Sequence, residues 1–189
     1  MTAFAWAWSA QRSSREPLNA ILRYWSSPDG KIIFKLRHSP LLQPTSMKQE
    51  IVSAGKGREY KWASDHVCVK TSCAHADGRL TVVEDTLKPG FHLARHFHKK
   101  MTEIFYILDG EVTFRFDDQT VVASRGMTIN IPPGVMHEVS SKDGARLITV
   151  FSPGGFDRYL EEMAAMTEAQ FADAALMQSL AEKYDIWPA

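Results

Sequence analysis

The chain has 189 residues, 22 basic and 22 acidic side chains, and 44% hydrophobic residues. This length suits one globular domain with a sizeable core. The balanced charge argues against binding to nucleic acid or to an anionic membrane, and no apolar run approaches the roughly 18 residues of a membrane span. The two cysteines, Cys68 and Cys73, are too few for a disulfide framework, so we expect a reducing, cytoplasmic setting.

Residues 1–46 differ in composition from the rest of the chain. They hold six basic but two acidic residues, and three of the five tryptophans. Met47 then begins a segment that looks like an ordinary bacterial protein start. Three interpretations of this N-terminal extension are open: a poorly ordered tail or start-site artefact, an appendage with a helix turn at 18–25 and a strand at 31–36, or a targeting segment. No function is assigned to it.

Residues 47–152 show the pattern of an all-β domain. Short runs rich in β-branched and aromatic residues alternate with turn residues such as Asp109-Gly110 and Pro132-Pro133-Gly134. The predicted strands are 66–70, 80–86, 92–98, 102–108, 111–116, 119–124, 127–131, 137–140 and 146–151. Regularly spaced short strands without intervening helices indicate an all-β sandwich or barrel.

Residues 153–189 show helical spacing instead. After a Pro-Gly-Gly breaker, Phe156, Leu160 and Met163 recur at helical intervals. Thr167 and Gln170 resemble a capping box, which is followed by a second amphipathic helix that extends to Leu180. We expect this segment to form a helical cap on the barrel.

Four residues form a candidate metal site. His96 and His98 lie two residues apart on a predicted strand, so both project from the same face with Cα atoms about 6–7 Å apart. Glu103 begins the next strand after a short turn, and His137 follows the Pro-Pro-Gly turn. Two buried imidazoles without a common partner would be costly, whereas a shared cation removes that cost. Three imidazoles and a carboxylate suit one divalent transition metal (Fe, Mn, Ni, Co or Zn) better than calcium.

These residues resemble the two sequence motifs of the cupin superfamily. The pattern G-x5-HxH-x4-E-x6-G is met by Gly90, His96, His98, Glu103 and Gly110. The pattern G-x5-PxG-x2-H-x3-N is met by Gly126, Pro132, Gly134 and His137, but Ser141 replaces its final Asn. The C-terminal region is similar to small single-domain bacterial cupins of the quercetin dioxygenase-like group. The resemblance implies a jelly-roll β-barrel with His96, His98, Glu103 and His137 as metal ligands inside one end.

The expected function is a metal-dependent dioxygenase that acts on a small enolisable or phenolic compound. Glu103 is the candidate general base. Phe105 and Ile107 share its strand face and would line the ligand cavity. His92 shares the parity of His96 and is a candidate substrate contact at the cavity mouth, although a surface histidine is the alternative. Two other functions remain open, namely a non-redox isomerase, cyclase or lyase, and a non-catalytic sensing module. Small cupins commonly pair through their sheets, so we also expect a homodimer.

Overall fold

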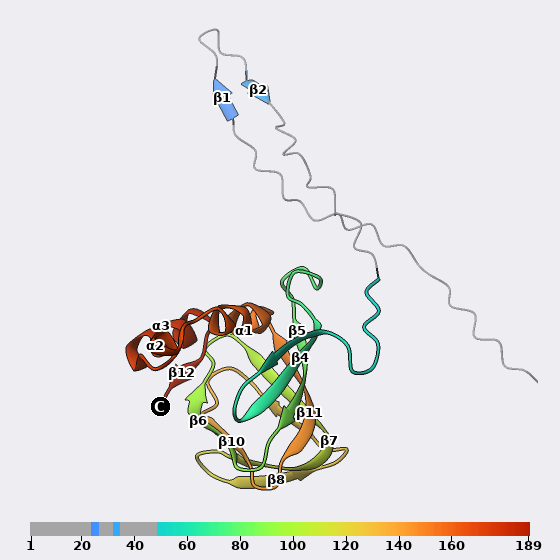
Figure 1. Ribbon diagram of the computed structural model, residues 1–189. Coiled ribbons are helices and arrows are strands. Elements are labelled where there is room, and N and C mark those ends of the chain that lie inside the picture. The colour runs from blue at the N-terminus through green and yellow to red at the C-terminus, as the bar shows by residue number, and fades with distance from the viewer. Residues whose placement is uncertain (1–23, 27–31, 35–48) are drawn as a thin grey trace, which may run out of the picture. The chain divides into compact units, whose positions relative to one another are not determined.

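The computed structural model describes residues 24–26, 32–34 and 49–189 (Figure 1). The chain divides into two compact units, Met1–Ser46 and Met47–Ala189. In the first unit, β1 (Tyr24–Ser26) pairs with β2 (Ile32–Phe34) in antiparallel orientation. The strand expected at 31–36 is thus present over Ile32–Phe34. The helix turn expected at 18–25 lies mostly outside the described residues, and its last two residues belong to β1.

The second unit consists of ten antiparallel strands and three short helices. The strands are β3 (Arg58–Lys61), β4 (Asp65–Thr71), β5 (Thr81–Leu87), β6 (Phe91–Phe97), β7 (Thr102–Arg115), β8 (Thr120–Ser124), β9 (Thr128–Ile131), β10 (His137–Ser141), β11 (Ala145–Ser152) and β12 (Trp187–Pro188). The helices are α1 (Phe156–Ala164), α2 (Glu168–Phe171) and α3 (Ala174–Lys183). Within the described residues, none of these helices has the length and hydropathy that crossing a membrane requires.

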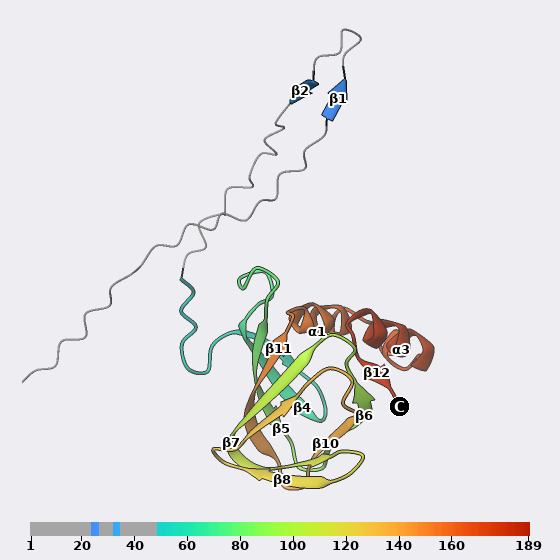
Figure 2. The ribbon, with the colours of Figure 1, turned by 180° about the vertical axis from the view of Figure 1, so that it is seen from behind.

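The long strand β7 joins the two layers of a jelly-roll barrel. Its first half pairs with β9 and β11, and the β3–β4–β5 strands extend that layer. Its second half pairs with β8 and β10, and β10 pairs in turn with β6, which pairs with β12. In both Figure 1 and Figure 2 the strands surround a common interior, and α1–α3 lie together at one end of it. The expected all-β jelly roll with a C-terminal helical segment is therefore confirmed.

Gly110 lets β7 pass from one layer to the other. Two strands separated by a turn at Asp109-Gly110 were expected, and this prediction is wrong because the chain continues as one strand. Gly110 has φ +76°, and a Cβ there would lie 2.6 Å from the Gly144 carbonyl oxygen. The register with β11 also shifts next to it, between Arg146 and Leu147. A left-handed glycine beside a bulge bends the strand instead of reversing it.

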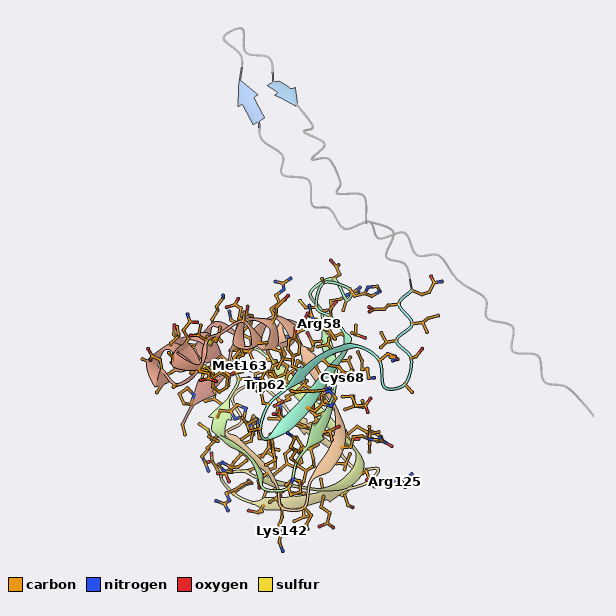
Figure 3. The ribbon with its side chains drawn as sticks, viewed as in Figure 1. Arg58, Trp62, Cys68, Arg125, Lys142 and Met163 are labelled. Atoms are coloured by element: carbon orange, nitrogen blue, oxygen red, sulfur yellow. The ribbon has the colours of Figure 1, made fainter. Side chains whose placement is uncertain are left out.

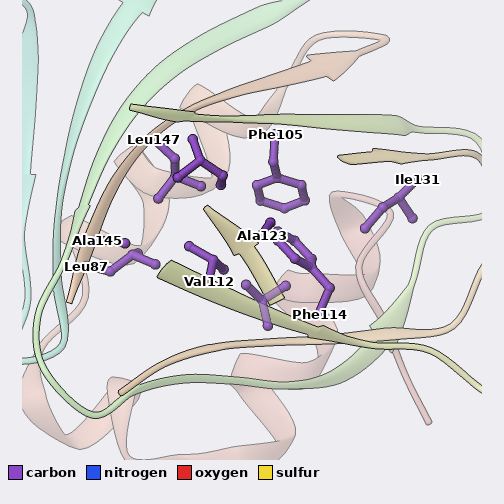
Figure 4. Close-up of a cluster of buried hydrophobic side chains, with 10 residues drawn as sticks. Leu87, Phe105, Val112, Phe114, Ala123, Ile131, Ala145 and Leu147 are labelled. Carbon is purple, nitrogen blue, oxygen red and sulfur yellow. The ribbon is translucent and has the colours of Figure 1, made fainter. Parts of the chain in front are cut away.

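Two apolar clusters fill the barrel and fasten the helices to it. The larger cluster lies between the layers and is shown in Figure 4; its buried members are Leu87, Phe105, Ile107, Val112, Phe114, Ala123, Ile131, Val139, Ala145 and Leu147. The second cluster includes Val83, Met101 and Phe151 from the barrel and Leu160 from α1. Phe151 also stacks on Phe156 with ring centroids 3.9 Å apart. Each large side chain that is fully buried contributes roughly 1.5–3 kcal/mol, so α1 is an integral part of the core.

The C-terminal helices differ in one respect from their expected form. The capping box of Thr167 and Gln170 is confirmed, since the Thr167 hydroxyl accepts the Gln170 N–H and the Gln170 side chain accepts the Thr167 N–H. The helix that it begins ends after one turn, at Phe171. A new helix starts because the Asp173 carboxylate accepts the N–H groups of Ala175 and Leu176 and so acts as an N-cap. The expected continuous helix is therefore α2 followed by α3.

The segment after α3 is tied to the β6–β7 turn by Asp185, which has φ +64°. The Asp185 carboxylate accepts hydrogen bonds from the N–H groups of Lys99, Lys100 and Met101 at 3.0, 2.8 and 2.8 Å. It also accepts the indole N–H of Trp187 at 3.1 Å. Burial alone would raise the pKa of Asp185, but these hydrogen bonds outweigh burial and lower it. One charged side chain thus orders the turn between two barrel strands.

Replacing Asp185 by asparagine should destabilise the fold. Asparagine tolerates a positive φ and keeps one oxygen acceptor, but it loses the charge and the second acceptor. We expect a loss of about 1–3 kcal/mol in the free energy of unfolding, measured by urea denaturation. The control is D118N in the exposed β7–β8 turn, and equal stability of the two variants would contradict the prediction.

Candidate metal centre

The structure brings together the four residues that the sequence singled out. One side-chain donor atom from each of them lies within 4.8 Å of the donors of the others, and all four residues are buried. His137 is the first residue of β10 and pairs directly with His96 on β6. His98 follows the end of β6, and Glu103 lies at the beginning of β7. Three neighbouring segments of the barrel therefore supply the cluster.

Backbone carbonyl groups fix the orientation of all three imidazole rings. In each ring Nδ1 is 2.8–3.0 Å from a carbonyl oxygen, which belongs to Ala94 for His96, to Asp185 for His98 and to Val135 for His137. A carbonyl oxygen can only accept a hydrogen bond, so Nδ1 carries the proton in each ring. In a neutral ring the lone pair is then on Nε2. Metal-binding histidines are commonly held by this kind of contact.

The contacts of Glu103 test whether a cation fits among these rings. Its Oε2 is 3.2 Å from His137 Nε2 and 3.3 Å from His98 Nε2. If the rings are neutral with protonated Nδ1, lone pairs face the carboxylate, and this arrangement needs a cation or a ring proton between them. Neighbouring ligands at right angles around an ion with bonds of about 2.1 Å are about 3 Å apart. The spacing and the donor types therefore fit, and the group could hold a metal ion.

Burial and mutual contacts set the protonation of this cluster. Burial raises the pKa of Glu103, but hydrogen bonds with His137 and His98 outweigh it and bring the pKa to about 2. Burial, helped by the nearby His137, lowers the pKa of His96 to about 4. For His98, burial lowers the pKa, but the contact with Glu103 raises it overall. At neutral pH the cluster thus offers a carboxylate and at least one neutral imidazole, the forms that bind metals.

Two predicted cavity residues lie beside the cluster, inside the barrel. Phe105 and Ile107 share the inner face of β7 with Glu103, and both are buried. Phe105 meets Phe114 edge-on with ring centroids 4.9 Å apart. The wall that continues from the donor cluster is therefore apolar and aromatic.

Asp85 is a polar residue of this interior that the sequence analysis did not single out. Its Oδ2 accepts a hydrogen bond of 3.4 Å from Thr149, whereas Oδ1 is shielded from solvent and has no hydrogen-bond partner among the described residues. Burial, with smaller effects from Asp65 and Glu103, raises the pKa of Asp85 to about 8. The alternation of Val83, Asp85 and Leu87 was the available signal, because it puts a carboxyl group on the inner face of a strand.

His92 does not join the cluster, and the expected shared face with His96 is wrong. Pairing with β10 shifts between His137↔His96 and Val139↔Leu93, so β6 contains one extra residue there. Such a bulge reverses the alternation of side chains along the strand. His92 therefore lies on the outer face, with its side chain 58% exposed and 3.5 Å from Glu138.

Ser141, which departs from the motif, has a structural contact. Its hydroxyl is buried and donates a 2.7 Å hydrogen bond to the carbonyl oxygen of Glu111 on β7. This contact links β10 to β7 at the end remote from His137. The substitution leaves the donor cluster intact.

A groove of about 500 Å³ lies elsewhere, between the β3 edge and the helices α1 and α2. Trp62 and Met163, labelled in Figure 3, both line it, and Tyr60 stacks on Trp62 at 5.8 Å. None of the four clustered residues contributes to its lining. The groove is thus separate from the candidate metal centre.

Comparison with known proteins supports the same interpretation of the barrel. Residues 83–151 match the family model described as "Cupin domain". Quercetin 2,3-dioxygenase of Bacillus subtilis (strain 168) is 26% identical over 90 residues, which cover 47% of this chain and 27% of the relative. The chain thus spans about a quarter of the length of that curated relative.

Solved structures share the fold at low sequence identity. KdgF from Halomonas sp. aligns with a TM-score of 0.52 and 16% identity over 58% of this chain and 99% of its own. An RmlC-like cupin from Shewanella frigidimarina NCIMB 400 aligns with a TM-score of 0.50 and 22% identity over 59% of this chain and 98% of its own. The family match, the jelly-roll topology and the buried His₃Glu cluster identify residues 83–151 as a cupin domain, and the solved structures share its fold.

Proposed function

We propose that this cupin is a metal-dependent dioxygenase that acts on a small enolisable or phenolic compound. The observation that carries the proposal is the buried His₃Glu cluster, whose imidazole rings are all turned toward one point by backbone carbonyls. The likeness to a quercetin 2,3-dioxygenase, which covers 47% of this chain, supports oxygen chemistry over the other chemistries open to cupins.

His96, His98, Glu103 and His137 are the proposed ligands of one divalent transition metal, of which Fe, Mn, Ni, Co and Zn all suit the donor set. Such an ion would supply Lewis-acid chemistry and, if redox-active, a route for electrons to dioxygen. The four residues are buried, so electrostatic interactions and hydrogen bonds among them act at low dielectric and are stronger than they would be in water.

Glu103 is the proposed general base. Its low pKa depends on its hydrogen bonds with His137 and His98, which oppose the effect of burial. If the carboxylate turns toward a ligand hydroxyl, it loses these contacts while it remains buried, and its pKa rises. A buried carboxylate released in this way is well suited to accept the proton of an enol or phenol.

Phe105 and Ile107 are the proposed apolar contacts of the ligand. Both lie on the β7 face that carries Glu103, and neither presents a polar group to the interior. This wall favours an aromatic or otherwise apolar ligand body and excludes water from the proton transfer.

The metal content of the purified protein tests whether the cluster binds an ion. Protein purified without chelator or affinity-metal resin should contain about one divalent metal ion per chain by elemental analysis. Chelation should lower the thermal midpoint, since an ion at about 100 times its dissociation constant stabilises the fold by about 2.7 kcal/mol.

H98A should lose the metal and the chelator sensitivity. The matched control H92A removes a histidine from the outer face of β6 and should keep both. Equal metal content in H98A and H92A would refute the assignment of the ligands.

The E103Q variant tests the catalytic role. Glutamine keeps an oxygen ligand but cannot accept the proton, so we expect much of the metal to remain while turnover falls by roughly 10²–10⁴-fold. The measurement is oxygen consumption against a panel of flavonols, catechols and β-diketones. E111Q, which changes an exposed glutamate on the same strand, is the control, and full turnover by E103Q rules out the role.

The same panel separates the reaction classes. Turnover that persists with redox-inert Zn(II) and consumes no oxygen identifies a non-redox enzyme. Thermal stabilisation by a compound that is never converted identifies a binding module.

The homodimer remains a prediction. Among the described residues, Tyr106 and Val122 are large hydrophobic side chains that stay exposed on the strands, and exposed side chains of this kind are often covered by a second copy. Light scattering at micromolar concentration should give twice the chain mass, and a monomer mass would refute the prediction.

A further inference from the structure

Asp85 is a carboxyl group placed in an apolar wall inside the barrel. It lies on the inner face of β5 between Val83 and Leu87, which are 0% and 5% exposed. Its partners across the neighbouring strands are Val67 on β4 and Leu147 on β11, which are both buried. Four apolar side chains thus border a group that is costly to bury.

The contacts of Asp85 do not account for its presence. The hydrogen bond from Thr149 is 3.4 Å long, close to the limit for such a bond, and the Oδ1 atom has no hydrogen-bond partner among the described residues. In the part of the chain that the structure describes, Asp85 forms no ion pair, and the charged groups that act on it, Asp65 and Glu103, are themselves acidic. If this position had a purely structural role, leucine or asparagine would destabilise the fold less than a buried aspartate does.

The position of Asp85 relates it to the metal centre. Thr149 pairs with Phe105, which lies two residues beyond Glu103 on the inner face of β7. Two residues correspond to about 7 Å along an antiparallel strand. The charge of Glu103 also contributes to the raised pKa of Asp85, so both carboxyl groups face the same interior. By this spacing, a molecule bound at the metal centre would extend by about one ring along Phe105 to meet Asp85.

We propose that Asp85, supported by Thr149, binds an oxygen substituent at the end of the ligand that is remote from the metal centre. The inference rests on the proposed function and narrows its substrate class to compounds with two separated oxygen functions, such as a catechol or enol ring that also carries a carbonyl or hydroxyl group. Burial raises the pKa of Asp85, which favours the protonated form of the carboxyl group. Its free oxygen can then donate a hydrogen bond to the ligand while Oδ2 accepts from Thr149.

The test compares two ligands that differ at the remote position. 3,4-Dihydroxybenzaldehyde carries a carbonyl oxygen there, and 4-methylcatechol carries a methyl group. Binding of each to the full chain loaded with redox-inert Zn(II) is measured by calorimetry. We expect wild-type protein to prefer the aldehyde by at least about tenfold, since a site that lacks its hydrogen-bond partner penalises the methyl analogue.

Three variants make the result specific. D85L should lose most of the preference for the aldehyde, with the zinc content unchanged, whereas D85N keeps a donor and should retain the preference. T86V, on the exposed face of the same strand, should behave as wild type. The thermal midpoint of D85L should be at least that of wild type, because an unpartnered buried carboxyl group is removed.

Each outcome has a distinct meaning. If D85L keeps the preference, or if its thermal midpoint falls well below that of wild type, the role of Asp85 is overturned and the metal-centre proposal stands. If zinc-loaded wild type binds neither compound, the phenolic ligand class of the proposed function and the inference built on it are overturned together.

Discussion

One buried carboxylate among three imidazole rings is the constraint on which the rest of this molecule depends. Glu103 is 4% exposed, and its Oε2 lies within 3.3 Å of the Nε2 atoms of His98 and His137. Such an arrangement is unfavourable in an apolar interior unless a cation compensates it. The fold nonetheless holds the four side chains together. The burial of the two apolar clusters around them supplies the stabilisation that offsets this cost.

The backbone determines the direction of each ring. Three carbonyl oxygens, from Ala94, Val135 and Asp185, accept from the Nδ1 positions. Two of these carbonyls are local, two residues before the ring that they hold, and follow directly from the course of β6 and of the turn before β10. The third is 87 residues away from His98, so tertiary structure alone supplies it. The geometry of the site is thus shared between the barrel and the segment after α3.

Much of the architecture could be predicted from the sequence because it depends on local spacing. The strands follow from period-two patterns, and the donor cluster follows from two histidines on one strand, the turn after them and a rigid Pro-Pro-Gly turn before a third. What failed depends on backbone irregularity. The bulge in β6 moved His92 to the outer face, and Gly110 bent β7 where a turn was expected. Asp185 and Asp85 escaped notice because their importance comes from partners that are distant in sequence.

The distant carbonyl at Asp185 has a consequence for the modularity of such barrels. Residues 153–189 cannot be exchanged for the tail of another cupin as a neutral graft, even if the graft packs well on Phe151. The grafted tail would need a backbone that turns left-handed at the position of Asp185 and presents an oxygen 2.8 Å from the His98 ring. Without that oxygen the imidazole is free to rotate about χ2, and a chimera with an intact barrel would still lack one coordinating nitrogen at the required angle.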